Sequence, residues 1–130
     1  MKIILDTNFL MAIAQFRIDI FSEIDRIADF RYDIFILDKT IDELNNIIKT
    51  QKGKDKMAAS LALQLINAKS IKQIKTKEGK TDDLIVENAS KDTVIATQDK
   101  ELKRRVKLKS AGIICIRQKK YLEIDKPSML

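Results

Sequence analysis

Four acidic side chains in this chain stand at positions from which they could act together on one metal ion. They are Asp6, Glu43, Asp82 and Asp99. Carboxylates that lie close together repel each other, so their ionised forms demand a cation. Hard divalent ions such as Mg²⁺ accept several carboxylate oxygens together with waters. Such an ion binds phosphate oxygens and lowers the pKa of a bound water, so hydrolysis of a phosphodiester is the chemistry that these residues would support.

The chain contains no histidine and only one cysteine, Cys115, which excludes several mechanisms. A Ser-His-Asp triad, a Cys-His pair and a histidine-based ribonuclease all need an imidazole, and an ordinary zinc site is disfavoured. Any catalysis must therefore use carboxylates, lysines, hydroxyls and hard metals. Because Cys115 cannot form an internal disulfide, we expect a reducing, cytoplasmic location and a buried, inert thiol.

Short apolar runs alternate with amphipathic segments and predict the elements that position these acids. Strands are expected at residues 2–5, 33–37, 71–75, 93–96, 113–116 and, as a last short strand, 121–124. Helices are expected over residues 7–16, 18–30, 40–50, 55–68, 82–90 and 99–109. This alternation indicates an α/β fold of three layers, α/β/α, around a central parallel sheet of about five strands.

The length of 130 residues suits a single domain, 1–130, with a tail that we expect to fray after about residue 125. No apolar run approaches the roughly 18 residues of a membrane span, so no membrane partner is expected. In a parallel sheet the connections that follow the strands open on the same edge, which brings Asp6, Glu43 and Asp99 together. Asp82 joins them if the loop from the third strand carries it there.

Each of these acids also has a structural interpretation. Thr40 and Glu43 have the spacing of a capping box, in which Glu43 bonds back to the Thr40 backbone. Asp6, Asp82 and Asp99 could instead be helix caps or acids of a first helical turn, stabilised by the helix dipole. Spacing alone does not choose between capping and a metal site.

The net charge of +6 is uneven along the chain. Residues 1–50 carry nine acidic and six basic side chains, whereas residues 51–130 carry ten acidic and nineteen basic ones. This asymmetry indicates a polyanionic partner such as RNA. The candidate nucleic-acid-binding residues form one stripe on helix 99–109 and a continuation beyond it: Lys100, Lys103, Arg104, Lys107, Arg117, Lys119, Lys120 and Tyr121. The alternative is an ordinary solvated helix face, with Leu102 and Val106 turned to the core.

Four motifs resemble those of PIN-domain nucleases, and they span nearly the whole chain in the family's order. They are ILDTNFLM, LDKTIDEL, TDDLIVENA and VIATQDKEL. The resemblance implies a catalytic site of Asp6, Glu43, Asp82 and Asp99 that binds Mg²⁺ or Mn²⁺. It also implies supporting roles for Thr7, Asn8, Asp83 and Thr97. Asp82 is favoured over Asp83 as the direct ligand because it lies seven residues before Ala89, and Asp38 is a cap or an outer ligand.

By this resemblance the protein is expected to be a metal-dependent endoribonuclease that leaves 5′-phosphate ends. The expected partners are RNA, a second copy joined through helices 7–16 and 18–30, and either an antitoxin protein or a ribosome-assembly factor. One alternative is the toxin ribonuclease of a VapBC toxin–antitoxin pair, and others are rRNA processing and general RNA turnover. A non-catalytic RNA-binding module is a further alternative, and a phosphoryl-transfer receiver ranks low because Asp6 has no second acid beside it.

Overall fold

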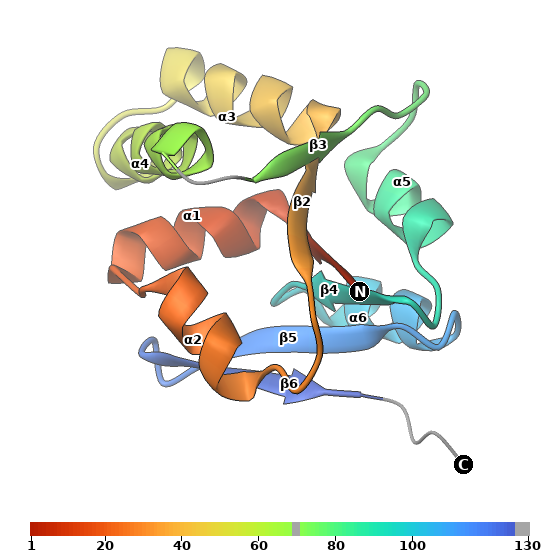
Figure 1. Ribbon diagram of the computed structural model, residues 1–130. Coiled ribbons are helices and arrows are strands. Elements are labelled where there is room, and N and C mark those ends of the chain that lie inside the picture. Colours follow the sequence, from red (N-terminus) through yellow and green to blue (C-terminus); the bar gives the residue numbers. More distant parts are fainter. Residues whose placement is uncertain (69–70, 127–130) are drawn as a thin grey trace.

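The computed structural model describes residues 1–68 and 71–126, and it contains one sheet of six strands (Figure 1). The strands are β1 Lys2–Leu5, β2 Asp33–Leu37, β3 Lys72–Ile74, β4 Thr93–Ala96, β5 Gly112–Arg117 and β6 Tyr121–Asp125. β1 to β5 are parallel, as predicted, and β3 is shorter than the expected range 71–75. β6 corresponds to the last short strand expected at 121–124, and it pairs antiparallel to β5. The tail predicted to fray lies mostly in 127–130, outside the described residues.

The turn between β5 and β6 lacks the residues that usually indicate a hairpin in a sequence. Gln118 and Lys119 have φ values of 53° and 55°, and the Lys120 N–H donates to the Arg117 carbonyl at 3.0 Å. Two successive left-handed residues make a hairpin turn that glycine and asparagine favour, and this sequence has neither there. The turn therefore forms without its usual signal.

The six helices connect the strands and cover both faces of the sheet (Figure 1). They are α1 Thr7–Phe16, α2 Ile20–Ile27, α3 Asp38–Thr50, α4 Lys54–Ala68, α5 Thr81–Asn88 and α6 Lys100–Lys107. Alternate residues of each strand face opposite sides. Ile3 and Leu5 therefore pack in the core formed with α1 to α4, whereas Ile4 packs in the core formed with α5 and α6. The expected three layers are confirmed.

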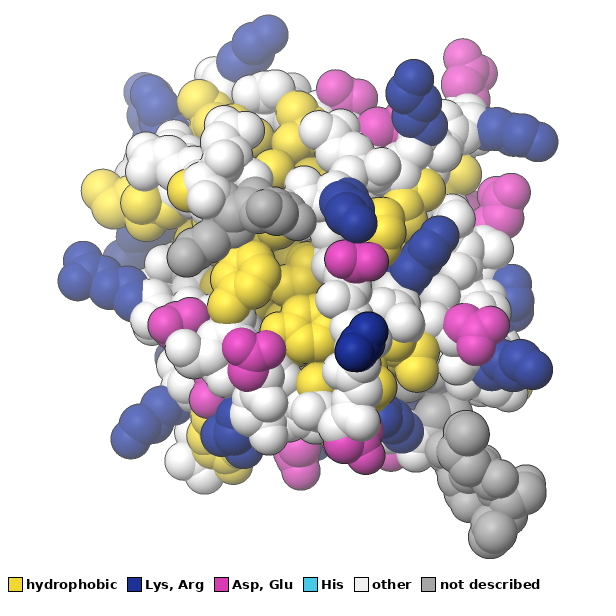
Figure 2. Space-filling view, viewed as in Figure 1, with side chains coloured by type: hydrophobic (Ala, Val, Ile, Leu, Met, Phe, Trp, Pro, Cys, Tyr) yellow, Lys and Arg dark blue, Asp and Glu magenta, His cyan; other side chains and the backbone are white. Residues whose placement is uncertain are grey.

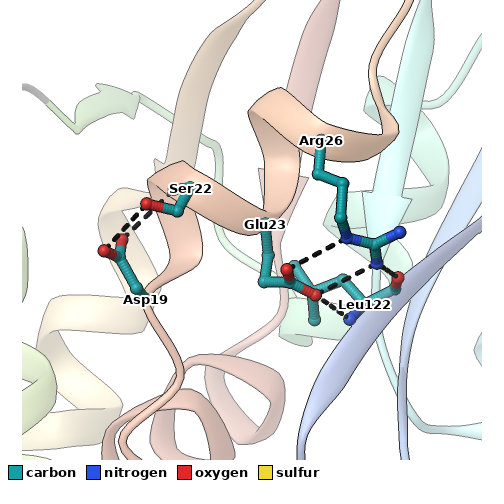
Figure 3. A network of polar contacts seen from close by, with 5 residues as sticks. All are labelled: Asp19, Ser22, Glu23, Arg26 and Leu122. Atoms are coloured by element: carbon teal, nitrogen blue, oxygen red, sulfur yellow. Dashed lines mark hydrogen bonds and ion pairs between the residues drawn. The ribbon is translucent and has the colours of Figure 1, made fainter.

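The boundaries of four helices differ from the predictions. The predicted helix 18–30 is only α2, because the Asp19 carboxylate caps it by accepting hydrogen bonds from the Ser22 N–H and hydroxyl (Figure 3). α3 begins at Asp38, two residues before the predicted Thr40, directly after β2. The predicted helices 82–90 and 99–109 are α5 and α6, which end two residues earlier than expected.

Side chains of α2 cover the outer edge of β6 (Figure 3). Glu23 Oε1 accepts from the Leu122 N–H at 2.8 Å, and an Arg26 guanidinium N–H donates to the Leu122 carbonyl at 2.7 Å. Glu23 and Arg26 also pair with each other at 3.1 Å. Unpaired edge groups invite pairing with another chain, so this clamp protects the edge of the sheet near the start of β6.

Basic and acidic side chains are mixed over the face shown in Figure 2, where a hydrophobic patch is visible between them. Large hydrophobic side chains at the surface of the described residues include Met57, Leu61 and Leu108. None of the helices described is long and apolar enough to cross a membrane.

Candidate active site

The sheet order places two strand ends side by side where the chain changes direction. In the order β3-β2-β1-β4-β5-β6, the chain builds outward from β1 on one side and from β4 on the other. Leu5 of β1 is in register with Ala96 of β4, and the Asp6 N–H donates to the Ala96 carbonyl at 3.0 Å. Ligands of open α/β sheets bind at such a switch point, beyond the carboxyl ends of the strands. Asp6 stands at this point.

Thr97 connects the acids that follow β1 and β4. Its side chain is fully buried, and its hydroxyl donates to Asp6 Oδ2 at 3.0 Å. The hydroxyl oxygen of Thr97 also accepts a hydrogen bond from the Asp99 N–H at 3.1 Å. A single hydroxyl group thus fixes the Asp6 carboxylate relative to the start of α6.

Glu43 is held by hydroxyl groups from two other segments of the fold. Thr81 Oγ1, at the start of α5, donates to Glu43 Oε1 at 2.7 Å. Thr7 Oγ1, at the start of α1, lies 3.0 Å from the same carboxylate oxygen and 3.0 Å from Thr40 Oγ1. Because a hydroxyl has one proton, Thr7 donates to Glu43 and accepts from Thr40. The capping box is therefore wrong for Glu43: Thr40 lies inside α3, and Glu43 reaches across to α1 and α5.

Asp6 is buried, and the negative charges of two other predicted acids reach it. Asp6 is 6 % exposed, and its pKa is raised to about 6, mainly because burial penalises its charge. The negative charges of Asp82 and Glu43 raise it further, whereas the Thr97 hydrogen bond opposes the rise. Asp6 occupies the N-cap position of α1 but makes no side-chain capping bond. Helix capping alone therefore does not explain why the Asp6 carboxylate is buried near two other negative charges.

Asp99 does cap a helix, as its structural interpretation predicts. Its Oδ1 accepts the Leu102 N–H at 2.9 Å at the start of α6. Asp99 is linked to Asp6 through the Thr97 hydroxyl. Asp82 lies in the first turn of α5, behind Thr81, where the helix dipole also favours its charge.

The neighbouring acid Asp83 points to a different partner. It pairs with Arg105 of α6 at 2.8 Å, which ties α5 to α6 on the far side of the helix from Glu43. Asp82, not Asp83, is thus the acid whose charge reaches Asp6. Asn8 is exposed, and its side chain makes no hydrogen bond within the described residues.

The donor set suits a hard divalent ion, although no three Asp, Glu or Cys side chains in the described part of the chain are already close enough to enclose one. The groups available are carboxylates and hydroxyls, which are ligands of Mg²⁺ and Mn²⁺. The raised pKa of Asp6 records the cost of ionising this carboxyl, which comes mainly from its burial and further from the negative charges of Asp82 and Glu43. A bound cation would offset that cost, so these carboxylates and hydroxyls fit a divalent metal ion such as Mg²⁺ or Mn²⁺.

The predicted basic stripe divides into paired and unpaired side chains. Arg104 pairs with Glu101, Lys107 with Asp125 and Arg117 with Glu123, all on the surface. Lys119 Nζ lies 5.7 Å from the centre of the Phe16 ring. No ion pair within the described residues involves Lys100, Lys103 or Lys120. Leu102 and Val106 are buried, as predicted, so the stripe faces solvent. Tyr121 is 37 % exposed at the start of β6.

Sequence reasoning missed two threonines that support the site, Thr40 and Thr81. Thr40 was assigned to a helix cap, and Thr81 stands directly before the first-turn acids of α5. It also left open the role of Asp38, whose carboxylate accepts from the Thr76 N–H at 3.2 Å and the Thr76 hydroxyl at 2.5 Å. Asp38 thus binds the loop after β3 rather than standing among the site acids.

Comparison with known proteins gives concordant matches. Residues 3–119 match a family described as "PIN like domain". The chain is 35 % identical to "Ribonuclease VapC4" of Methanocaldococcus jannaschii over 127 residues, 95 % of each chain. It is 27 % identical to "Ribonuclease VapC9" of Archaeoglobus fulgidus, covering 94 % of this chain and 87 % of that protein. Its fold is similar to the solved PIN domain endonuclease Utp24, with a TM-score of 0.76, 22 % identity and coverage of 97 % and 92 %.

Proposed function

Because this chain belongs to the family of PIN-like domains, we propose that it is a divalent-metal-dependent endoribonuclease. The names of its two curated relatives, both ribonucleases, support RNA as the substrate. The observation that carries the proposal is the buried Asp6 at the switch point of the sheet, whose raised pKa also reflects the negative charges of Asp82 and Glu43.

In this proposal the four acids bind the metal together, and threonine hydroxyl groups position them. Asp6, Asp82 and Asp99 bind Mg²⁺ or Mn²⁺ with Glu43 completing the set, and all four are the candidate catalytic residues. When bound, the metal supplies Lewis-acid activation of water and of the scissile phosphate. Thr7, Thr81 and Thr97 hold the carboxylates in place through their hydroxyl groups. Asn8, exposed beside Asp6, is placed to meet a ligand water or the RNA.

The basic side chains beyond β4 and β5 would hold the RNA backbone. α6 starts at the Asp99 cap, so Lys100 and Lys103 lie within one turn of the acidic edge. Surface ion pairs are weak and exchange readily with phosphate, so the pairs of Arg104 and Lys107 do not prevent binding. Tyr121 offers a ring on which a base can stack.

Cleavage of a 5′-labelled RNA with Mg²⁺, Mn²⁺ or EDTA tests the proposal, with Asp6→Asn beside the wild-type protein. We expect cutting that needs the metal and is reduced at least a hundredfold by Asp6→Asn. The matched control is Asp42→Asn, an exposed acid on α3, which should cut normally. Equal cutting by wild-type protein and Asp6→Asn would indicate a contaminant. RNA bound but never cut would instead favour a non-catalytic binding module.

A second candidate function is the toxin ribonuclease of a toxin–antitoxin pair, with an antitoxin protein as the partner. The 35 % identity with Ribonuclease VapC4 over nearly the full length favours it. Expression in a heterologous host should then arrest growth, and Asp6→Asn should relieve the arrest. Normal growth with active wild-type enzyme would favour RNA processing or turnover. The likeness to Utp24 supports the fold alone, so it does not favour a ribosome-assembly role.

A further inference from the structure

The loop between β3 and α5, residues 75–80, is attached to α3 at both of its ends. At one end the Asp38 carboxylate accepts from the backbone and the hydroxyl of Thr76. At the other end Thr81 Oγ1 donates to Glu43 at 2.7 Å. In Figure 1 the loop leaves β3 and stands away from the body of the molecule before it enters α5. Its ends are thus anchored although its middle is exposed.

Three lysines with no acidic partner lie on this loop. Lys75, Lys77 and Lys80 are all exposed, and no ion pair within the described residues includes them. By contrast Lys72, just before the loop, pairs with Asp33 and lies 5.8 Å from the Phe35 ring centre. The loop contains one acid, Glu78, so its net charge is positive.

This loop lies at the same edge of the sheet as the acids, on the opposite flank from α6. β3 is parallel to β2 and β1, so the loop leaves the carboxyl end of the sheet. The sheet order puts β3 at one margin, whereas β4, which leads into α6, lies beyond β1. The acids at the ends of β1 and β4 therefore stand between two groups of lysines.

We propose that the loop 75–80 is a second phosphate-binding segment, which holds the RNA strand on the side of the cleavage site opposite α6. This inference rests on the proposed ribonuclease function and extends it to the path of the substrate. A strand held on one flank only would meet the carboxylates end-on and be repelled by them. Contacts on both flanks carry it across the acids and place an internal phosphodiester there, as endonucleolytic cutting needs.

The anchoring by threonines makes this contact more effective than that of lysines on a free loop. A loop whose ends are already ordered loses less conformational entropy when RNA binds. Thr81 also joins the loop to Glu43, so the loop and this site acid are held by one helix, α3.

The test is the salt dependence of RNA binding, measured in the Asp6→Asn background with Mg²⁺ so that the RNA is not cut. The variant is Lys75→Gln/Lys77→Gln/Lys80→Gln, and the control is Lys49→Gln/Lys52→Gln/Lys91→Gln. The control lysines are equally exposed and change the net charge equally, but they lie at the end of α3, in the α3–α4 connection and in the turn before β4.

We expect the loop variant to bind a single-stranded RNA about tenfold or more weakly at 0.1 M salt. Its plot of log affinity against log salt should be shallower by about 2, since each lost phosphate contact removes about 0.7. The control should retain the affinity and the slope, and both variants should unfold at the parental temperature.

Equal binding by the loop variant and the control would overturn the inference, as would a wild-type protein that binds no RNA. The result is separable from the proposed function, because Asp6→Asn tests cleavage and the lysines are tested by binding alone. Metal-dependent cutting with no effect of the loop lysines would leave the nuclease standing and remove only this second contact.

Discussion

The hydrogen bonds of each acid at the carboxyl edge determine what its replacement will do. Asp6 is buried and receives one hydroxyl hydrogen bond, whereas Glu43 shares one of its oxygens between two threonines. Asp99 has one oxygen committed to the first turn of α6. The same chemical change, carboxylate to amide, therefore affects folding differently at each position.

At Asp6 we expect Asp6→Asn to stabilise the metal-free protein while it abolishes cleavage. The pKa of Asp6 is about 6 in the folded protein against 3.8 as its ordinary value. Between these values the folded state holds a proton that the unfolded state has lost, so the stability from this group falls as pH rises. Above pH 6 the loss amounts to about 3 kcal/mol.

Chemical denaturation in EDTA at several pH values measures this effect. The stability gained by Asp6→Asn over the wild-type protein should grow from pH 4 to pH 6 and stay constant above pH 7. Asp42→Asn, on the exposed side of α3, should show no such trend. A gain in stability that is independent of pH would show that ionisation of Asp6 does not destabilise the folded protein.

At Thr81 we expect Thr81→Val to lower the cleavage rate about tenfold, because Glu43 loses the hydroxyl that orients it. Stability should fall by about 1 kcal/mol, the usual value of one hydrogen bond. Thr81→Ser keeps the hydroxyl and should restore most of the rate, as measured with labelled RNA at saturating Mg²⁺. Equal losses in both variants would assign Thr81 a packing role.

The adjacent acids Asp82 and Asp83 should separate cleanly in the same assay. We expect Asp82→Asn to lose at least a hundredfold in cleavage and Asp83→Asn to lose less than threefold. The reason is that Asp83 is engaged with Arg105, whereas the charge of Asp82 reaches Asp6. A large loss in Asp83→Asn would move the ligand assignment to that residue.

At the scale of elements, α3 organises one half of the site. Its first residue, Asp38, binds the loop after β3, and Glu43 binds the starts of α1 and α5. Two connections that are remote in the sequence, β1–α1 and β3–α5, thus meet on one helix. On the other half, Thr97 joins the end of β4 to the end of β1.

The clamp of α2 on β6 should contribute more to stability than other surface ion pairs. Glu23 and Arg26 also bond the Leu122 backbone, so Glu23→Ala/Arg26→Ala should cost about 2 kcal/mol and speed hydrogen exchange at the Leu122 amide. Glu101→Ala/Arg104→Ala removes a pair of the same spacing with no backbone partner, and should cost less than about 0.5 kcal/mol. Similar losses in both variants, by urea denaturation, would contradict this role.

For the whole molecule, Mg²⁺ or Mn²⁺ should raise the unfolding temperature by relieving repulsion among the site acids. A ligand that binds only the folded state stabilises it by mass action, so the rise should grow with metal concentration. Asp6→Asn should abolish most of the rise. The measurement is thermal unfolding of protein that has first been treated with EDTA and then given Mg²⁺, Mn²⁺ or, for comparison, Ca²⁺. An equal rise in Asp6→Asn would place the metal elsewhere.

Local physical rules in the sequence account for most of the elements. The continuously apolar runs around Ile4 and Ile95 predict strands that are buried on both faces, and the structure has strands there. α1 has the bounds that its periodicity predicts. The absence of histidine leaves carboxylates as the natural catalytic groups. These inferences depend only on neighbours along the chain.

The tertiary structure decided which interactions those residues make. Thr40 and Glu43 have capping-box spacing, but because α3 follows β2 without a turn, Glu43 was free to bind Thr7 and Thr81. Asp82 and Asp83 are neighbours in the chain, and only the packing of α5 against α6 turns Asp83 to Arg105. The reason is that side chains separated by more than twenty residues meet only when the fold brings their elements together, and local spacing carries no record of that arrangement.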